Sequence, residues 1–271
     1  MRSKQILLTG GTGFIGANLA RRLLSAGHQV ALLSLPSADR SRISEVERRI
    51  QVLRGDVTDA AVVRSAVQQV RPDIVYHMAS TPFNPPTTRA QTHMQVIVLG
   101  TLNLLDALVD HPGVRVIYTG SVAEYGSGSA LREDSPLLPG TLLGAAKAGA
   151  SLLMQTYARL YRMETVVVRL FTPYGPWDGP GRLIPYTVLS ALDGQDVRIS
   201  NGKQQRDYVY VDDVVEALLL AAERPIRAGT VFNICSGRGI PICEVVELTL
   251  KLMGSPVRLL VGALPTRPDE I

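Results

Sequence analysis

The sequence predicts an α/β protein with a doubly wound parallel sheet and a smaller C-terminal lobe, on three observations. Short apolar runs rich in β-forming residues alternate with segments long enough to form crossover helices. A glycine-rich segment directly follows the first of these runs. After residue 170 the chain changes to proline- and glycine-rich loops around shorter regular elements. The alternation implies a sheet covered on both faces, because parallel strands need crossover connections.

Each predicted strand is a short apolar run between polar or turn-forming residues. The helix after the first strand is expected over residues 14–25, where Ile15, Leu19 and Leu23 recur at helical spacing and Gly27 ends the pattern. The same alternation continues along the chain. The predicted strands lie at residues 6–9, 30–33, 52–53, 74–77, 114–118 and 166–170.

Length and composition indicate a globular chain with small anionic ligands. The 271 residues are 46% hydrophobic and 19% charged, which is enough to bury a full core. The net charge is only +4 and the basic residues are scattered singly, so we expect no nucleic acid or membrane partner. Cys235, Cys243 and four histidines form no metal or disulfide pattern. With no leader or bilayer-spanning run, the sequence predicts a cytoplasmic protein without metal.

The glycine-rich segment has the spacing and position of a Rossmann-type dinucleotide-binding loop. Gly10, Gly13 and Gly16 lie between the first strand and the first helix. Gly10 permits a tight turn, Gly13 lets the backbone approach a pyrophosphate, and Gly16 allows the helix to pack closely on the strand. Phe14 and Ile15 would offer backbone N–H groups at the helix N-terminus. The alternative is a glycine turn with a purely structural role.

The residues after the second strand favour NADP(H) over NAD(H). Ser34 stands where an NAD-specific enzyme usually has an acid, and Arg40 and Arg42 follow it. A hydroxyl and guanidinium groups suit a 2′-phosphate, although both arginines are equally compatible with a solvated loop. Asp56 follows the third strand, where it would accept a hydrogen bond from adenine or, alternatively, cap a helix together with Asp59.

These signals divide the chain into two lobes. Residues 1–170 are expected to form the NAD(P)-binding domain, and residues 171–271 to form mainly a substrate-binding lobe. A complete lobe and a lobe with an incomplete C-terminal end are both compatible with the sequence. Residues 208–222 read as a strand entering a helix, and residues 231–234 as one more sheet strand. The first domain therefore also receives residues 206–235, and ligands should lie between the lobes.

The sequence resembles the extended short-chain dehydrogenases/reductases, and within them the nucleotide-sugar epimerases, dehydratases and ketoreductases. The resemblance covers essentially the whole chain. It implies a nicotinamide cofactor and a nucleoside diphosphate sugar as ligands. Besides the glycine loop and Asp56, the matching stretches are residues 77–79, 100–105, 121–126, 144–147, 169–176, 206–213 and 267–270.

The resemblance implies a reactive centre that is only partly present here. In this family a Ser or Thr, a Tyr and a Lys act together, and Ser121 and Lys147 match the first and last of them. Leu143 stands where the family pattern has the Tyr, and Ile97 stands where it commonly has an Asn. The usual acid/base is thus absent, although Ser121 can still bond a sugar oxygen and Lys147 can hold the nicotinamide ribose.

A reduction at a sugar carbon needs another proton donor in place of that Tyr, because a positioned acid/base contributes roughly 10²–10⁴-fold to the rate. His93 precedes Ile97 by one helical turn and is the candidate replacement. Tyr118, Tyr125 and an ordered water are the alternatives.

The residues after Ser121 disfavour a sugar 4,6-dehydratase. By resemblance, dehydratases carry an acidic pair directly after the Ser or Thr, and this chain has Val122 and Ala123 there. Glu124 lies one position too late to supply the second acid.

The resemblance also assigns a nucleotide-sugar site. Arg206 and Arg267 match positions that bind the diphosphate, and Thr172 replaces an Asn in the stretch before Tyr174. An ion pair of Arg206 with a neighbouring aspartate is the structural alternative.

The expected function is an NAD(P)-dependent ketoreductase acting on a nucleotide-linked keto-deoxyhexose. One alternative is an epimerase that retains its cofactor, and another is a non-catalytic protein that binds both ligands. The helices near residues 99–108 and 146–161 carry more apolar surface than one sheet face needs. Relatives often pair through such helices, so the resemblance implies a homodimer.

Overall fold

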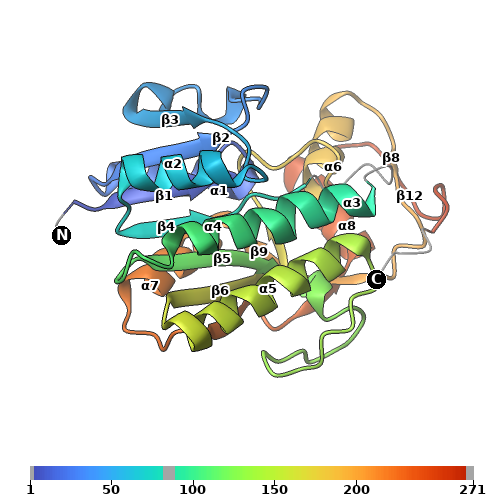
Figure 1. Ribbon diagram of the computed structural model, residues 1–271. Coiled ribbons are helices and arrows are strands. Elements are labelled where there is room, and N and C mark those ends of the chain that lie inside the picture. Colours follow the sequence, from blue (N-terminus) through green and yellow to red (C-terminus); the bar gives the residue numbers. More distant parts are fainter. Residues whose placement is uncertain (1–2, 82–88, 267–271) are drawn as a thin grey trace.

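A seven-stranded parallel sheet forms the centre of the computed structural model, which describes residues 3–81 and 89–266 (Figure 1). The strand order is β10-β6-β5-β4-β1-β2-β3, and it reverses direction between β1 and β4. This arrangement confirms the predicted fold class. The strands are β1 (Gln5–Thr9), β2 (Gln29–Ser34), β3 (Ile50–Arg54), β4 (Ile74–His77), β5 (Arg115–Ser121), β6 (Glu164–Leu170) and β10 (Thr230–Ile234).

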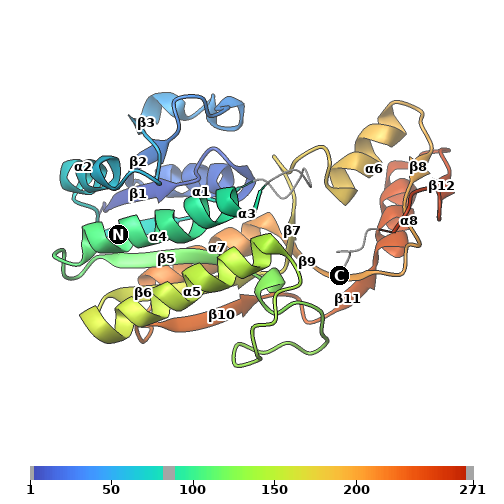
Figure 2. The ribbon, with the colours of Figure 1, turned by 45° about the vertical axis from the view of Figure 1, so that its right-hand side comes forward.

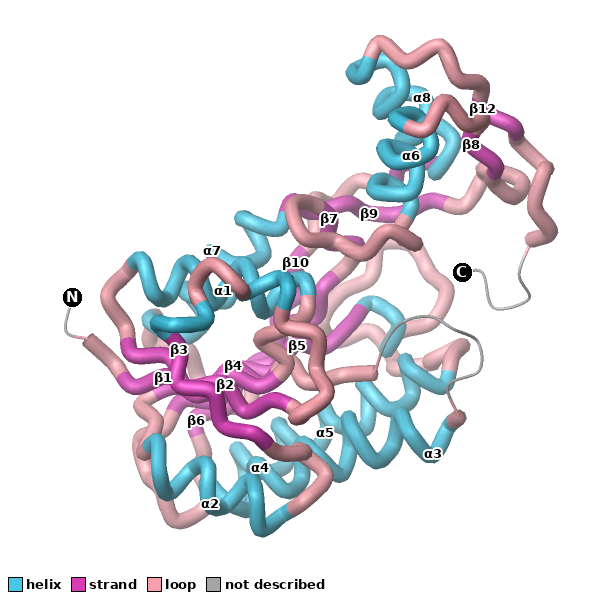
Figure 3. The backbone as a smooth tube through the Cα atoms, turned by 90° about the horizontal axis from the view of Figure 1, so that it is seen from above, coloured by secondary structure: helices cyan, strands magenta, loops and turns pink. Residues whose placement is uncertain are grey.

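Helices cover both faces of this sheet, which is why its strands read as continuous apolar runs (Figure 3). Helices α1 (Phe14–Ser25) and α7 (Val211–Glu223) bury one face in one hydrophobic cluster. Helices α2 (Ala60–Val70), α4 (Gly100–Leu108) and α5 (Leu142–Tyr161) bury the other face.

The helix that contains the candidate residues His93 and Ile97 is irregular. A short α3 (Ala90–His93) continues through a π-helical turn, η3 (Met94–Leu99), into α4. Such turns widen the backbone and recur at functional sites. Short 3₁₀ turns lie at η1 (Ser41–Ile43), η2 (Glu47–Arg49) and η4 (Val122–Glu124).

A smaller lobe lies beyond the carboxyl ends of the sheet strands (Figure 2). Its three-stranded sheet has the order β11-β9-β7, and a separate apolar cluster packs α6 against α8. Within residues 206–235, β9 pairs in this small sheet, whereas α7 and β10 return to the large one. The elements are β7 (Thr172–Tyr174), α6 (Leu183–Leu192), β8 (Val197–Arg198), β9 (Gln205–Tyr210), β11 (Gly239–Pro241), α8 (Ile242–Met253) and β12 (Leu259–Leu260).

Two absences apply to the residues that the structure describes. None of their helices has the length and hydropathy of a membrane span. They also contain no group of three or more His, Cys, Asp or Glu side chains that could hold a metal ion.

Candidate active site

The loop between β1 and α1 leaves no room for side chains at Gly10 and Gly16, as a dinucleotide site requires. Gly10 has a φ of +71°, and a Cβ added there would lie 2.5 Å from the carbonyl oxygen of Met78. A Cβ on Gly16 would overlap the carbonyl of Gly10, so α1 starts directly against the turn. Gly13 precedes α1 and no side chain caps the helix. The first N–H groups of α1 therefore remain available to an anion.

The two arginines expected near the adenosine ribose have protein partners. Arg40 forms a 2.9 Å ion pair with Glu47, and the Nε of Arg42 donates to the carbonyl oxygen of Trp177 at 2.9 Å. The hydroxyl of Ser34 is buried at the end of β2. A 2′-phosphate would thus have to replace Glu47 as the partner of Arg40.

Trp177 belongs to a strap that connects the two lobes. Its ring lies 4.6 Å from the guanidinium carbon of Arg21 on α1. Asn18, one turn closer to the glycine loop, donates to the carbonyl oxygen of Pro176 at 3.0 Å. The strap, residues 175–182, joins β7 to α6 along the chain and packs against α1, the helix that opens the dinucleotide site.

The two aspartates after β3 have separate roles. Asp59 caps α2, since its Oδ1 accepts hydrogen bonds from the N–H groups of Ala61 and Val62. Asp56 instead accepts from the N–H of Thr58 at 2.9 Å, in a tight turn at the end of β3. Asp56 is thus not part of that helix cap, and its carboxylate lies at the carboxyl edge of the sheet.

Ser121 and Lys147 both lie near the carboxyl end of β5. Ser121 ends β5, and its Oγ accepts a hydrogen bond from the N–H of Ala123 at 3.1 Å, so its own proton is free to be donated. The Nζ of Lys147, on α5, donates to the carbonyl oxygen of Thr119 at 2.7 Å. Burial lowers the pKa of Lys147 to about 8, against the opposing effect of the Glu124 charge.

Leu143 lies in the first turn of α5, four residues before Lys147. It packs partly buried against the core on the α4 and α5 side of the sheet. The next residue, Gly144, is so close to the carbonyl of Ala123 that a Cβ there would overlap it. The start of α5 thus touches the Ser121 turn, but residue 143 brings no hydroxyl to it.

His93 is 7% exposed, and its side chain hydrogen-bonds a residue at the carboxyl edge of the sheet. Its Nδ1 lies 2.6 Å from the Oγ1 of Thr81, which follows β4 at the carboxyl edge of the sheet. Ile97 is fully buried in the π-helical turn, and its carbonyl oxygen accepts from the hydroxyl of Thr101 at 2.5 Å. The position at which the family commonly has Asn is therefore core.

The alternative proton donors Tyr118 and Tyr125 are both buried, at 0% and 2% exposure. Tyr118 is inaccessible, its hydroxyl has no hydrogen-bond partner among the described residues, and burial raises its pKa. The hydroxyl of Tyr125 donates to Asn233 at 2.7 Å and accepts from Arg169 at 2.6 Å. Neither hydroxyl is open to a ligand.

His77 is a buried residue whose role the sequence did not reveal. Its Nε2 lies 3.0 Å from Thr101 and its Nδ1 lies 2.7 Å from Thr9. Because the Thr101 hydroxyl donates to Ile97, it accepts from His77, which fixes the Nε2–H tautomer. Burial, with the nearby Lys147 charge, lowers the pKa of His77 to about 3. A neutral imidazole thus ties β1 to the helix that begins at α3.

The structural role of Glu124 also escaped the sequence analysis, although its signal was visible. Ser121 and Glu124 have capping-box spacing. The Ser121 side chain accepts from a backbone N–H of the η4 turn, and the Glu124 side chain accepts from the backbone N–H of Ser121. The carboxylate is fully buried and pairs with Arg169 at 2.8 Å. It is therefore not placed as the acid of a dehydratase.

Polar and aromatic side chains line the strands of the smaller lobe. Thr172 pairs with Tyr208 in the register of β7 and β9. The Nη1 of Arg206 donates to the carbonyl oxygen of Gln205 at 2.9 Å. Burial raises the pKa of Tyr208, and the charges of Arg206 and Arg182 oppose that rise, so two cations lie near this ring. Arg267 lies outside the described residues.

The aspartate beside Arg206 has a structural task. The Asp207 carboxylate accepts from the N–H groups of Ser236 and Gly237 at 2.7 and 2.8 Å, and from the Ser236 hydroxyl at 2.8 Å. It therefore fixes the loop that follows β10.

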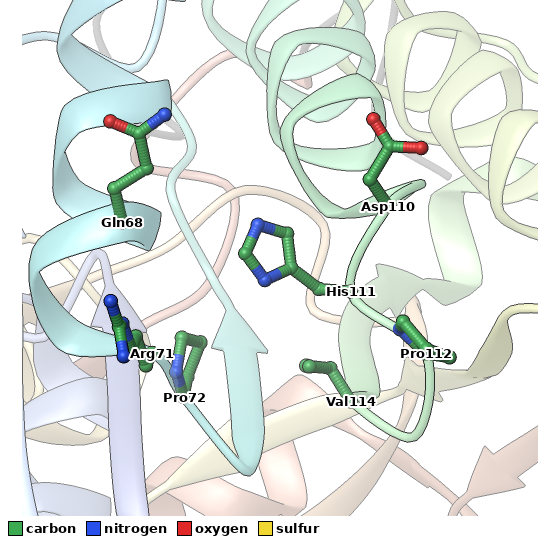
Figure 4. A pocket seen from close by; sticks show the side chains of 7 residues that line it. All are labelled: Gln68, Arg71, Pro72, Asp110, His111, Pro112 and Val114. Carbon is green, nitrogen blue, oxygen red and sulfur yellow. The ribbon is translucent and has the colours of Figure 1, made fainter.

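A surface pocket of about 440 Å³ lies away from this site (Figure 4). Its lining residues come from the end of α2 and the segments that lead into β4 and β5, including Arg71, His111 and Val114. These are the amino ends of the strands. Ligands of doubly wound sheets bind at the carboxyl ends, where Ser121 and the glycine loop lie.

Comparison with known proteins agrees with this geometry. The model of the NAD dependent epimerase/dehydratase family matches residues 6–235. A dTDP-glucose 4,6-dehydratase of Streptomyces niveus is 31% identical over 279 residues, which cover 98% of this chain and 82% of that protein.

Solved structures share the whole architecture. The UDP-N-acetylglucosamine 4-epimerase of Methanobrevibacter ruminantium, in complex with UDP-N-acetylmuramic acid, superposes with a TM-score of 0.91 at 25% identity. The aligned region covers 100% of this chain and 88% of that chain. The UDP-glucose 4-epimerase of Thermus thermophilus, in complex with NAD, has a TM-score of 0.86 at 27% identity. The aligned region covers 98% of this chain and 88% of that chain. The predicted family is confirmed. This chain belongs to the NAD-dependent epimerase/dehydratase family, in the nucleotide-sugar group of the extended short-chain dehydrogenases/reductases.

Proposed function

We propose that this chain binds NADP(H) and a nucleoside diphosphate sugar and reduces a keto-deoxyhexose. The observation that carries the proposal is the arrangement of Ser121 and Lys147. The N–H of Ala123 occupies an acceptor site of the Ser121 hydroxyl, so the hydroxyl proton is left for a ligand oxygen. Lys147 adds a buried positive charge beside the same strand. Such a pair suits a carbonyl oxygen that becomes negative during reduction.

The glycine loop fits a dinucleotide, because added side chains at Gly10 and Gly16 would collide with backbone and α1 begins uncapped. Gly13, Phe14 and Ile15 would hold the pyrophosphate, and Lys147 the nicotinamide ribose. When bound, the nicotinamide dinucleotide supplies hydride-transfer chemistry.

The preference for NADP(H) rests on Ser34, Arg40 and Asp56. A serine hydroxyl does not repel a 2′-phosphate, and Arg40 could exchange Glu47 for it. Asp56 would accept from the adenine amino group at the other side of the site.

Protonation is assigned to the Thr81–His93 pair. Thr81 donates its hydroxyl proton to the alkoxide oxygen of the sugar, and His93 replaces that proton through the 2.6 Å hydrogen bond between Nδ1 and Oγ1. Ser121 holds the sugar oxygen throughout. Leu143 supplies neither a proton nor a hydrogen bond.

The diphosphate of the sugar is assigned to the smaller lobe. Arg206 and Arg267 would bind its oxygens, with Thr172 as a hydroxyl donor. Arg182 joins them, because its charge reaches Tyr208 from the start of α6. Guanidinium groups suit phosphate oxygens in geometry and charge.

We also propose a homodimer through α4 and α5. Leu152 and Leu160 on α5 are 53% and 69% exposed, which favours burial against a second copy. Sedimentation of the Leu152→Glu variant tests this, since it should convert a dimer to a monomer.

The test of function mixes the protein with NADPH or NADH and a nucleotide-linked 4-keto-6-deoxyhexose, and follows cofactor oxidation and the sugar product. Stoichiometric oxidation with a reduced sugar, faster with NADPH, is expected. Isomerisation without net oxidation would identify an epimerase, and binding without change a non-catalytic protein. His93→Gln should slow the reaction, whereas the control His111→Gln, at the remote pocket, should not.

A further inference from the structure

A buried ion pair lies directly behind Ser121. Glu124 is 0% exposed and Arg169 is 2% exposed, and the Nε of Arg169 lies 2.8 Å from the Oε2 of Glu124. Charges buried this deeply are tolerated only when their other hydrogen-bonding groups are also satisfied. Here the Oε1 of Glu124 accepts from the backbone N–H of Ser121 at 2.8 Å. The ion pair therefore holds the backbone of the reactive serine.

The pair extends into a network that ties four segments together. The Nη1 of Arg169, on β6, donates to the Tyr125 hydroxyl at 2.6 Å and to the carbonyl oxygen of Glu133 at 3.2 Å. Tyr125 in turn donates to the side chain of Asn233, on β10, at 2.7 Å. The N–H of Asn233 donates to the Glu133 carboxylate at 2.9 Å. The ends of β5, β6 and β10 are thereby joined to the connection that leads into α5.

The carboxylate of Glu124 occupies the space that a side chain at residue 120 would need. A Cβ on Gly120 would overlap the Oε1 of Glu124 and lie 3.0 Å from the Cγ of Arg169. The absence of a side chain at residue 120 thus lets the carboxylate lie against the strand end. Any displacement of Glu124 must move the backbone of Ser121 or break its hydrogen bond.

We infer that Glu124 and Arg169 are positioning residues for the reaction, which fix the end of β5 so that the Ser121 hydroxyl points its proton at the sugar oxygen. This inference rests on the proposed function, because it takes Ser121 as the group that contacts the sugar. It assigns Glu124 a structural and electrostatic role and no acid/base role.

The charge of Glu124 has a second consequence, at Lys147. Burial lowers the pKa of Lys147 to about 8, and the Glu124 carboxylate opposes that shift. The other titratable groups that face Lys147 are Tyr118, whose ring lies 5.0 Å from Nζ, and His77, which is neutral. Lys147 carries its charge below pH 8 and loses it above. Removal of the Glu124 charge lowers its pKa further, so activity that needs this charge should disappear at a lower pH.

Two variants of Glu124 separate geometry from charge. Glu124→Gln keeps the shape and removes the charge, so kcat should fall at least tenfold and the alkaline limb of the pH profile should move to lower pH. Glu124→Asp keeps the charge but shortens the side chain, so kcat should fall while the limb stays in place. The Kd for NADPH should remain within about twofold in both, because the glycine loop is untouched.

The matched control is Asp106→Asn, which alters a carboxylate that bonds the Tyr157 hydroxyl between α4 and α5, far along α5 from Lys147. Asp106→Asn should lower the melting temperature without moving kcat or the pH limb. If both Glu124 variants behave like this control, Glu124 stabilises the fold and positions nothing. Arg169→Lys, which keeps the charge but loses the bond to Tyr125, serves the same comparison if Glu124→Gln does not fold.

Calorimetric titration with NADPH and with the nucleotide-linked keto sugar separates this inference from the proposed function. If the wild-type protein does not bind the sugar, the proposed function fails. If the wild-type protein and Glu124→Asp bind the sugar equally well and turn over equally fast, the positioning role is refuted. Weaker sugar binding or slower turnover by Glu124→Asp, with NADPH affinity retained, supports it.

Discussion

Replacing Leu143 with Tyr should restore a proton donor beside Lys147. Residue 143 precedes Lys147 by four residues of α5, a rise of about 6 Å, so the two residues share one helix face. At that separation and an effective dielectric constant of about 20, a phenolate and an ammonium attract each other by about 3 kcal/mol. This energy corresponds to about 2 units of pKa. A tyrosine with an ordinary pKa near 10 would therefore titrate near pH 8.

A donor with such a pKa is well matched to neutral pH, and general acid catalysis contributes roughly 10²–10⁴-fold. The expected gain in the single-turnover rate of NADPH oxidation is about 10²-fold, since the start of α5 already touches the Ser121 turn. Leu142→Tyr is the control, because Leu142 is 53% exposed and one residue away on another helix face. The reasoning is refuted if the Leu143 variant, folded and able to bind both ligands, reacts no faster than this control.

Three further predictions concern the cofactor site and acid stability. Gly10→Ala should lower the free energy of unfolding by at least about 1–2 kcal/mol for the left-handed backbone alone, and its Cβ would also strike the carbonyl of Met78. Chemical denaturation measures the loss of stability, and NADPH titration measures the loss of cofactor binding. A variant as stable as wild type would contradict the predicted backbone strain at Gly10. His77 stays neutral down to pH about 3, whereas the imidazole of the unfolded chain binds a proton near pH 6.5. The free energy of unfolding should therefore fall as the pH drops from about 6.5 to about 3, by up to about 1.4 kcal/mol per pH unit. His77→Gln should remove this pH dependence, and an unchanged dependence would assign the effect to other groups. Arg40→Ala should reduce the ratio of kcat/KM for NADPH to kcat/KM for NADH by about tenfold. Glu47→Gln, which frees Arg40, should raise the same ratio. If neither variant changes this ratio, Arg40 does not bind the 2′-phosphate.

The sheet could be predicted from the sequence because both of its faces are buried. Its strands therefore appear as uninterrupted apolar runs, and the glycine loop identified the carboxyl edge near which Ser121 and Lys147 lie. The strands of the smaller lobe are two to six residues long and partly exposed, so they carry little periodic signal.

The contacts around the reactive residues depended on long-range packing. Glu124 and Arg169 are 45 residues apart, and no local pattern pairs them. Arg40 and Arg42 were predicted as phosphate ligands from position alone, but Glu47 and the strap around Trp177 compete for them. The π-helical turn at Met94–Leu99 follows from backbone register, which an apolar helical sequence does not encode.

The strap also contains the single tryptophan of the chain. Trp177 stacks on Arg21 of one lobe while its own backbone belongs to the segment that enters the other. Its emission is therefore an intrinsic optical reporter of the junction, because separation of the lobes would remove the guanidinium from the indole ring. Stopped-flow fluorescence after mixing with a ligand can therefore detect any change at this junction without an attached dye.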